Sequence, residues 1–560
     1  MAERKHYDYV VVGAGSAGCV LAYRLTADPS VRVLLLEAGG RDTHPLIHIP
    51  IGLGKIWEHR MFDWGYDTEP EPRLDNRRIE AMRGKVLGGS SSINVMAYVR
   101  GHRGDYDRWA QQGCRGWSYA EVLPYFKRCE RWEKGEDPWR GGHGPLSVID
   151  TRNQDPLFDA WLDAAREADW PYTEDYNGKD QEGFGRSQWT IRNGRRCSAA
   201  VAFLRPAMRR ANLTVETSAL ATRVLLEGTR ATGVEYARHG RLHQVSTTRE
   251  VLLAGGVFNT PQLLMLSGIG AADHLREIGI APTANLPGVG KNLQDHLSVD
   301  VHHARRGRGP FHAEMRLDRT AVNMIRAYVF GTGPGTVLPS RLHAFLKTRR
   351  ELPVPDIQFL FRGAPARATP WFPGVTPPYE DSFGLRPVML HPESRGVVRL
   401  RSADPSAPVR IMQNFLATEH DVRTIREGVK LGRDIARRKG LDPFRGRETA
   451  PGPDSRTDAE IDAFVRRTAI TAHHPCATCA MGAGKDAVLD PALRVRGVEG
   501  LRVVDASAMP DLVSGNINAC VLMIAEKAAD LVLGQPPLPT VTNAHPDSQP
   551  GRRAPFGSRP

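Results

Sequence analysis

The sequence predicts an α/β fold of two domains, in which a parallel-sheet domain is joined to a second domain that contains its own sheet. A short apolar run at residues 7–12 ends at a glycine-rich loop, and a helical pattern follows over 16–27. A second apolar run at 31–36 completes a strand–helix–strand unit, whose crossover is expected to be right-handed. Residues 297–464 differ, with proline-rich turns and alternating apolar runs such as 357–361. These runs predict the strands of the second sheet.

The chain is expected to return to the first sheet after a long irregular stretch. Residues 44–83 are rich in Pro, Gly and Trp and show no period, so we expect no regular elements there. Runs at 213–224, 234–236 and 245–253 predict a small antiparallel piece. The last run leads into Gly255-Gly256, in the manner of a strand that rejoins the first sheet.

These shifts divide the chain between the two domains. A helix is predicted over 519–533, with apolar positions suited to packing on a sheet. The tail at 535–560 is expected to be disordered because it has few large apolar residues. We assign 1–155, 195–300 and 467–534 to the first domain, and 156–194 with 301–466 to the second.

Composition limits the class of protein. The 560 residues are 41% hydrophobic and 25% charged, which supports full cores. The formal charge is +12, but the arginines are scattered, and we find no basic helix beside an apolar stripe. A solvated basic surface is therefore expected, with no nucleic-acid partner. We expect no transmembrane segment and no signal peptide. Seven cysteines form no disulfide framework, so we expect a cytoplasmic location.

Residues 13–18, with the sequence GAGSAG, fit the dinucleotide pattern G-x-G-x-x-G between a strand and a helix. Gly13 permits the tight turn, Gly15 lets the backbone approach a pyrophosphate, and Gly18 allows close helix–strand packing. Backbone N–H groups near Ser16 would face the phosphates. Glu37 follows at about the 20-residue spacing of a carboxylate that binds ribose hydroxyls. These features do not separate FAD from NAD, but the acid disfavours the 2′-phosphate of NADP.

Four further segments carry family information: residues 84–94, 256–270, 287–296 and 474–530. Together they resemble the glucose–methanol–choline (GMC) oxidoreductases, most broadly the choline-dehydrogenase-like members. The resemblance spans about residues 6–533, although Val257 departs from the small residue usual at its place. It implies a Rossmann-type FAD-binding domain and a substrate-binding domain built on an antiparallel sheet with helices.

The resemblance also implies FAD as cofactor and assigns residues to it. Some relatives carry a histidine, covalently linked to the flavin, where Ile93 stands here, so we expect non-covalent FAD. Ribose contacts are implied for Glu37 and Ala38, and a backbone contact to adenine for Val224. The residues implied around the pyrophosphate and isoalloxazine are Trp64, Gly89, Asn94, Met96, Ala97, Asp505, Ala506, Asn516 and Ile517.

Alcohol oxidation needs a base for the hydroxyl proton, and histidine suits this role because its ordinary pKa is about 6.5. By resemblance to the family's His-Pro pattern, His474 is the catalytic base. His473 is expected to line the substrate site, with a role as base the alternative. Asn518 is the implied second catalytic residue, orienting the substrate oxygen. Its structural alternative is a cap of the following helix.

Cys476 and Cys479 form a C-x-x-C beside these histidines. Read alone, the spacing could indicate a zinc site or a redox pair. A structural zinc site needs a second ligand pair, which the sequence does not offer, so we expect buried thiols and no metal.

The substrate is expected to be a small alcohol, oxidised at a primary position to the aldehyde with hydride passing to flavin N5. Choline-specific relatives place a glutamate in a stretch that aligns with 340–346, where Arg341 would repel choline. Arg341 could equally face solvent. A neutral alcohol, or one bearing a carboxylate, is favoured, and the acceptor is oxygen or a quinone- or dye-type acceptor. Choline dehydrogenase proper and an FAD-containing hydroxynitrile lyase are the alternatives.

Overall fold

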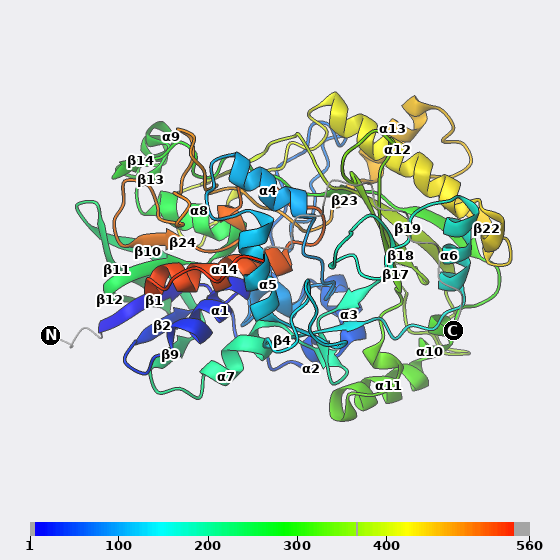
Figure 1. Ribbon diagram of the computed structural model, residues 1–560, viewed down its shortest axis with the longest axis horizontal. Coiled ribbons are helices and arrows are strands. Elements are labelled where there is room, and N and C mark those ends of the chain that lie inside the picture. The colour runs from blue at the N-terminus through cyan, green and yellow to red at the C-terminus, as the bar shows by residue number, and fades with distance from the viewer. Residues whose placement is uncertain (1–5, 366–367, 542–560) are drawn as a thin grey trace.

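The computed structural model describes residues 6–365 and 368–541, which form two sheet domains side by side, the first on the left of Figure 1 and the second on the right. The first domain holds a seven-stranded sheet of order β10-β11-β12-β1-β2-β9, with β24 paired to β12. Its strands are β1 (His6–Val12), β2 (Val33–Leu36), β9 (Leu213–Glu216), β10 (Ala219–Glu227), β11 (Arg230–Arg238), β12 (Arg241–Leu253) and β24 (Leu501–Val503).

Strand β12 joins the parallel and antiparallel parts of this sheet. Its first half pairs antiparallel with β11, and its second half pairs parallel with β1, where Val251 lies opposite Val10. The single strand predicted over 213–224 is wrong, because Ser218 adopts a left-handed backbone (φ 55°) that divides the run. The first part, β9, extends the parallel edge beside β2, and only β10 belongs to the antiparallel part.

Helix α1 (Ser16–Leu25) packs on β1 and β2, and helix α14 (Asn518–Leu533) packs against α1. Helix α14 is buried along most of its length, and its carboxylate Glu526 is fully covered. Arg24 and Arg128 form ion pairs with this carboxylate, at 2.8 and 2.7 Å. Such pairing is required, since an unpaired buried carboxylate would be strongly destabilising.

Part of the predicted disordered tail is packed. Leu538 donates its backbone N–H to Tyr125 of α5 (Tyr119–Cys129) over 3.2 Å, and Leu538 and Val541 lie against the core. Residues 542–560, the rest of that prediction, lie outside the described residues.

The second domain is an eight-stranded antiparallel sheet of order β22-β16-β19-β18-β17-β5, with β15 bridging β19 and β23. Helices α6 (Leu157–Glu167), α12 (Glu419–Ala436) and α13 (Asp458–Thr468) lie on its outer side (Figure 1). Trp161 of α6 packs edge-on against Phe361. The strands are β5 (Gly183–Arg186), β15 (Leu297–Ser298), β16 (Val301–Arg305), β17 (Leu342–Leu346), β18 (Ile357–Arg362), β19 (Ser382–Met389), β22 (Arg445–Ala450) and β23 (Ile470–Thr471).

Two expectations about this region need correction. Strands β15 and β23 belong to the second sheet, although our boundaries placed both in the first domain. They pair with each other, so the chain leaves the second sheet at Thr471, two residues before His473. The stretch 44–83 is also not wholly irregular, because it contains α2 (Pro45–His48) and α3 (Leu53–Glu58). Both are too short to show a period.

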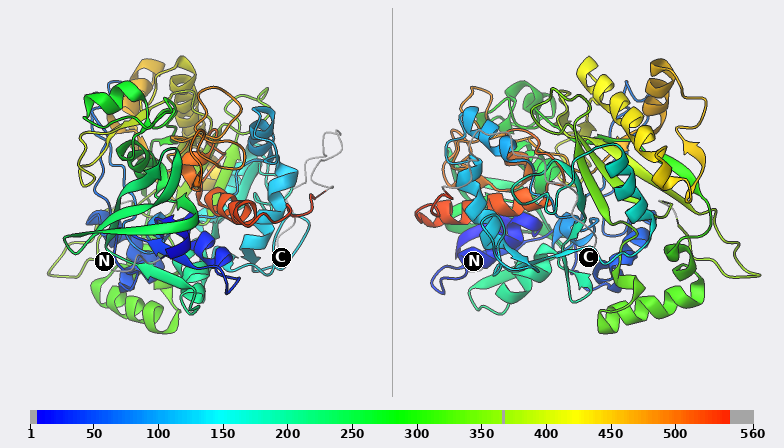
Figure 2. Two further views of the ribbon diagram at one scale, coloured as in Figure 1. Left: turned by 90° about the vertical axis from the view of Figure 1, so that its left-hand side faces the viewer. Right: turned by 45° about the vertical axis from the view of Figure 1, so that its right-hand side comes forward.

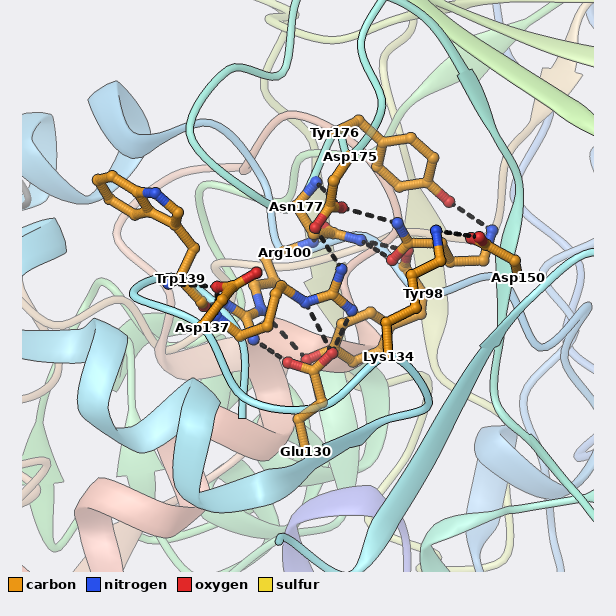
Figure 3. A network of polar contacts seen from close by, with 12 residues as sticks. Tyr98, Arg100, Glu130, Lys134, Asp137, Trp139, Asp150, Asp175, Tyr176 and Asn177 are labelled. Carbon is orange, nitrogen blue, oxygen red and sulfur yellow. Dashed lines mark hydrogen bonds and ion pairs between the residues drawn. The ribbon is translucent and has the colours of Figure 1, made fainter. Parts of the chain in front are cut away.

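A buried ion network ties the two domains together (Figure 3). Glu130 pairs with Arg100 and Arg140, and Arg140 also reaches Asp175 at 2.7 Å. Two positive and two negative charges balance, so no buried charge is left uncompensated. Asn177 accepts from the Arg100 backbone N–H at 2.7 Å, which holds the irregular segment that carries Val99.

Among the described residues, no helix combines the length and the apolar character needed to cross a membrane.

Candidate active site

One cavity joins the glycine-rich loop after β1 to the segment that carries His474. Most residues predicted for the site from the sequence line it. They are Gly13, Gly15, Ser16, Glu37, Ala38, Trp64, Gly89, Asn94, Ala97, His473, His474, Asp505, Ala506, Asn516, Ile517 and Asn518.

Glycine is needed at the three motif positions for different structural reasons. A Cβ on Gly13 would lie 2.5 Å from Ala254 O, and one on Gly18 would lie 1.9 Å from Gly13 O. Both glycines therefore permit close backbone packing, and Gly18 does not line the cavity. A Cβ on Gly15 would meet nothing nearer than Ala254 O at 4.0 Å. Gly15 thus leaves open space beside the start of α1, where a phosphate can approach the backbone.

Two carboxylates shape the walls of this end of the cavity. Glu37 accepts from the N–H groups of Ala14 and Gly39, each at 2.8 Å. Burial raises its pKa to about 7. Asp505 accepts from the Gly256 N–H at 2.9 Å and the Thr260 hydroxyl at 2.6 Å. It therefore anchors the start of α8 (Gly256–Leu266), which forms part of the wall.

Besides Gly18, two residues predicted to contact the cofactor do not line the cavity. The Val224 N–H donates to Ser267 Oγ at 2.9 Å, and residues 219–221 of the same strand line the cavity instead. Met96 has a left-handed backbone (φ 64°) and is completely buried in a separate apolar cluster. Its neighbours Val95 and Ala97 line the cavity.

His474 lies at the other end of the cavity, held through its backbone and both ring nitrogens. Its N–H donates to Asp295 Oδ1 at 2.8 Å. Its Nδ1 lies 2.9 Å from Nδ1 of His296, whose Nε2 lies 3.2 Å from Leu390 O. Its Nε2 lies 2.9 Å from Nδ2 of Asn516.

These contacts define the protonation of both rings. Leu390 O can only accept, so the neutral His296 carries its proton on Nε2 and accepts at Nδ1. His474 must then carry its proton on Nδ1 and donate to His296. Its Nε2 therefore keeps an unprotonated lone pair, to which Asn516 Nδ2 donates. Burial lowers the pKa of His474 to about 3, with smaller effects from His473 and Arg83, so the ring is neutral.

The partner predicted for His474 is wrong by two residues. Asn516, and not Asn518, contacts the imidazole, and Gln358 of β18 lies 3.5 Å from Asn516 Oδ1, which turns Nδ2 toward His474. Asn518 is the first residue of α14, with Ile517 as its cap, and accepts from the Ser16 hydroxyl at 2.7 Å. Two positions at a helix start project in different directions, so the two amides reach different groups.

Gly515 explains the placement of Asn516. Its backbone adopts φ 120°, and a Cβ there would lie 2.6 Å from Val99 Cγ1. Arg100, the residue after Val99, is held by the buried ion network of Figure 3 and by Asn177. The network thus supports Asn516 indirectly, through the contact between Val99 and Gly515.

The family model described as GMC oxidoreductase matches residues 7–298 and, in its C-terminal part, 392–525. The chain belongs to the GMC oxidoreductases. FAD is the cofactor typical of this family, and the chain is an oxidoreductase that acts on CH–OH donors.

Relatives of this GMC oxidoreductase match it over nearly its full length. "Choline dehydrogenase, mitochondrial" of Homo sapiens is 47% identical, over 96% of this chain and 91% of that protein. "Oxygen-dependent choline dehydrogenase" of Brucella ovis is 43% identical, over 95% and 96%. The crystal structure of pyridoxine 4-oxidase from Mesorbium loti gives a TM-score of 0.84 at 34% identity, covering 93% of this chain and 98% of that one.

The cavity of this GMC oxidoreductase fits FAD at the dinucleotide end. Gly15 and Gly256 both face open space that a Cβ would fill, and both line the cavity. Glu37 keeps a carboxylate at the end of β2, where a ribose would lie. Ile93, at the place of the covalent histidine of some relatives, also lines the cavity.

Arg341 does not line the cavity, contrary to its prediction as a substrate contact. It pairs with Asp159 at 3.1 Å and is largely covered. The alignment that placed it beside the substrate therefore gives no argument against choline. It does not face solvent freely either.

The cysteine pair is explained by packing. Cys476 and Cys479 are free and completely buried, and burial raises the pKa of both thiols. Neither is poised to ionise or to react at neutral pH. The described residues contain no cluster of three or more His, Cys, Asp or Glu side chains suited to a metal ion.

Sequence reasoning missed His296, Gln358 and Arg83. Asp295 and His296 lay inside a segment that resembled the family, but nothing in their spacing from His474 indicated contact. Arg83 lines the cavity and donates to His473 O at 3.0 Å, so it fixes the turn before His474. Contacts between residues so far apart in the chain leave no local pattern.

Proposed function

We propose that the chain oxidises a neutral primary alcohol to the aldehyde, with His474 as the general base. The observation that carries this proposal is the pair formed by the His474 Nε2 lone pair and Asn516 Nδ2, 2.9 Å apart in a cavity that continues to the dinucleotide loop. Bound FAD supplies the hydride acceptor at flavin N5.

His474, Asn516 and His296 have separate roles in the proposed reaction. A substrate hydroxyl that takes the place of the Asn516 amide at Nε2 can donate its proton to His474 and accept from the displaced amide through the same oxygen. Asn516 thereby orients the oxygen and stabilises the alkoxide character that develops as the proton leaves. His296 accepts from Nδ1 of His474 throughout and keeps the ring turned toward the substrate.

Charge at the catalytic end favours a neutral alcohol over choline. Arg83 is the cation that lines the cavity near His473, and the two lining carboxylates, Glu37 and Asp505, are engaged at the dinucleotide end. A quaternary ammonium is bound best by a carboxylate together with aromatic rings, and among the described residues this end offers the ring of Trp57 beside His473 without a carboxylate. Choline remains the second candidate, because the relatives named above are choline dehydrogenases.

We propose that FAD is held without a covalent bond. This proposal is supported by Ile93, whose aliphatic side chain cannot bond to the flavin. Denaturation of the purified protein should release all of the yellow cofactor into the supernatant. Flavin that stays on the unfolded chain would contradict the proposal.

We also propose a cytoplasmic location. Seven free, buried thiols are in keeping with a reducing compartment. Oxygen and a quinone-type acceptor both fit the shared chemistry, and the experiment below distinguishes them.

An anaerobic screen of flavin bleaching tests the proposed function. Unbranched, aromatic and anionic primary alcohols are mixed with the holoenzyme, together with choline and a hydroxynitrile. Neutral primary alcohols should bleach the flavin fastest, and repeating the hits with oxygen or a quinone identifies the acceptor. Choline as the fastest substrate would sink the neutral-alcohol proposal, and cleavage of the hydroxynitrile without bleaching would indicate a lyase.

A further inference from the structure

Large apolar side chains exposed on this molecule gather on one helix. Of the nine that are exposed in the described part of the chain, six belong to α11 (Leu317–Phe330). A seventh, Val375, lies in the turn that follows Trp371, which pairs with Arg316 at the start of α11. Surface apolar residues are normally scattered singly, so this concentration marks an interaction surface.

The exposed residues form a stripe along the helix. Val322, Ile325 and Val329 are spaced by three and four residues and therefore share one face. That face is opposite the one that carries the buried Asn323 and Ala327. Figures 1 and 2 show α11 at the outer edge of the second domain, with one side turned away from the rest of the chain.

Basic groups flank the apolar stripe. A hollow of about 600 Å³ beside α11 is lined by Arg305, Arg308, Arg316 and Arg319, with Trp371. Arg305 and Arg316 are paired with Asp155 and Asp318. Within residues 6–365 and 368–541, Arg308, Arg319 and Arg326 have no acidic partner within 4.0 Å.

This arrangement differs from our expectation, which was that the chain has no basic helix beside an apolar stripe. Only the structure shows that the stripe of α11 faces outward, and that Arg308 is brought to it from a separate loop. An exposed apolar face next to unpaired arginines is the pattern of a helix that lies in the plane of a membrane surface.

We propose that α11 and its basic flank are a peripheral docking surface for an anionic phospholipid bilayer. The apolar stripe enters the acyl boundary, and the arginines bind lipid phosphates. The charge of this surface argues against a second copy of the chain as its partner. A two-fold contact through this helix would bring the unpaired Arg319 and Arg326 of both copies together without a counter-charge.

Vesicle sedimentation of the FAD-loaded enzyme tests the proposal. The protein should pellet with phosphatidylcholine vesicles that contain phosphatidylglycerol, more weakly with phosphatidylcholine alone, and less at high salt. Ile325→Glu with Val329→Glu should lower partitioning at least about tenfold, because two exposed apolar side chains that would enter the acyl boundary are lost. Arg319→Gln with Arg326→Gln should remove the preference for anionic lipid.

The matched control is Leu242→Glu, which replaces an equally exposed apolar residue on β12 of the other domain. It should bind vesicles as the wild type does. Flavin content and alcohol oxidation should be unchanged in every variant, because none of these residues lines the catalytic cavity. Equal partitioning of the wild type and the Ile325→Glu/Val329→Glu variant would overturn the proposal. So would a wild-type dimer that the same variant converts to monomers.

Discussion

The two ends of the cavity are built in different ways. At the dinucleotide end, one continuous loop offers its backbone to a phosphate: Gly13 and Gly18 allow close packing, and Gly15 leaves open space, while Glu37 and Asp505 line the walls. At the catalytic end, side chains from distant segments meet, with His474, Asn516 and His296 each on a separate stretch. The first end can therefore tolerate changes at the second, and each can be altered separately.

The largest expected effect is at the catalytic end. His474→Ala should slow flavin reduction by about 10²–10⁴-fold, because the proton acceptor is lost. Flavin absorbance should persist, since His474 contributes nothing to the glycine-rich loop. Anaerobic stopped-flow measurements give the rate. His473→Asn is the control, because Asn tolerates the left-handed backbone at that position (φ 64°). If His473→Asn slowed flavin reduction more than His474→Ala does, His473 and not His474 would be the base.

The dinucleotide end gives a matched pair of glycine variants. Gly15→Ala should leave the fold intact, since its Cβ would be 4.0 Å from the nearest atom, but should weaken FAD binding by about tenfold or more. Gly18→Ala should lower the melting temperature of the apoprotein, since its Cβ would be 1.9 Å from Gly13 O. Flavin titration and thermal unfolding separate the two effects. If Gly15→Ala bound FAD with wild-type affinity, the prediction that a phosphate lies beside Gly15 would be wrong.

The smallest expected effect concerns pH. A histidine with the ordinary pKa of about 6.5 would lose about 30-fold of its neutral form at pH 5. Because the pKa of His474 is lowered to about 3, flavin reduction by a non-ionising alcohol should change less than about twofold between pH 8 and pH 5. Thermal unfolding over the same range excludes acid denaturation. A rate that falls through pH 6.5 would show that the ring is not held neutral.

The sequence predicted best what depends on local backbone. The strand–loop–helix unit, Glu37 and the buried α14 all follow from short-range patterns. Asn516 was misassigned to a secondary role because two asparagines flank one isoleucine, and only the direction of the chain at the start of α14 separates them. The predicted adenine contact of Val224 is wrong for a similar reason, because the turn at Ser218 determines which part of β10 reaches the cavity.

Other features depend on long-range packing. His296 and Gln358 reach the site from strands of the second sheet or beside them. The outward face of α11 reads as an ordinary amphipathic pattern, and a pattern does not reveal which face is covered. Arg341 was placed by alignment alone, and its partner Asp159 lies on a helix distant in the chain.

The most direct test compares the two asparagines in single-turnover flavin reduction by a primary alcohol. Asn516→Ala should lower the rate by about 10²–10³-fold with FAD still bound, because the donor to the substrate oxygen is removed. Asn518→Ala should reduce flavin at close to the wild-type rate, because its amide contacts Ser16 and not His474. A slow Asn518→Ala enzyme beside a fast Asn516→Ala enzyme would contradict the arrangement of His474 and Asn516 as the catalytic pair.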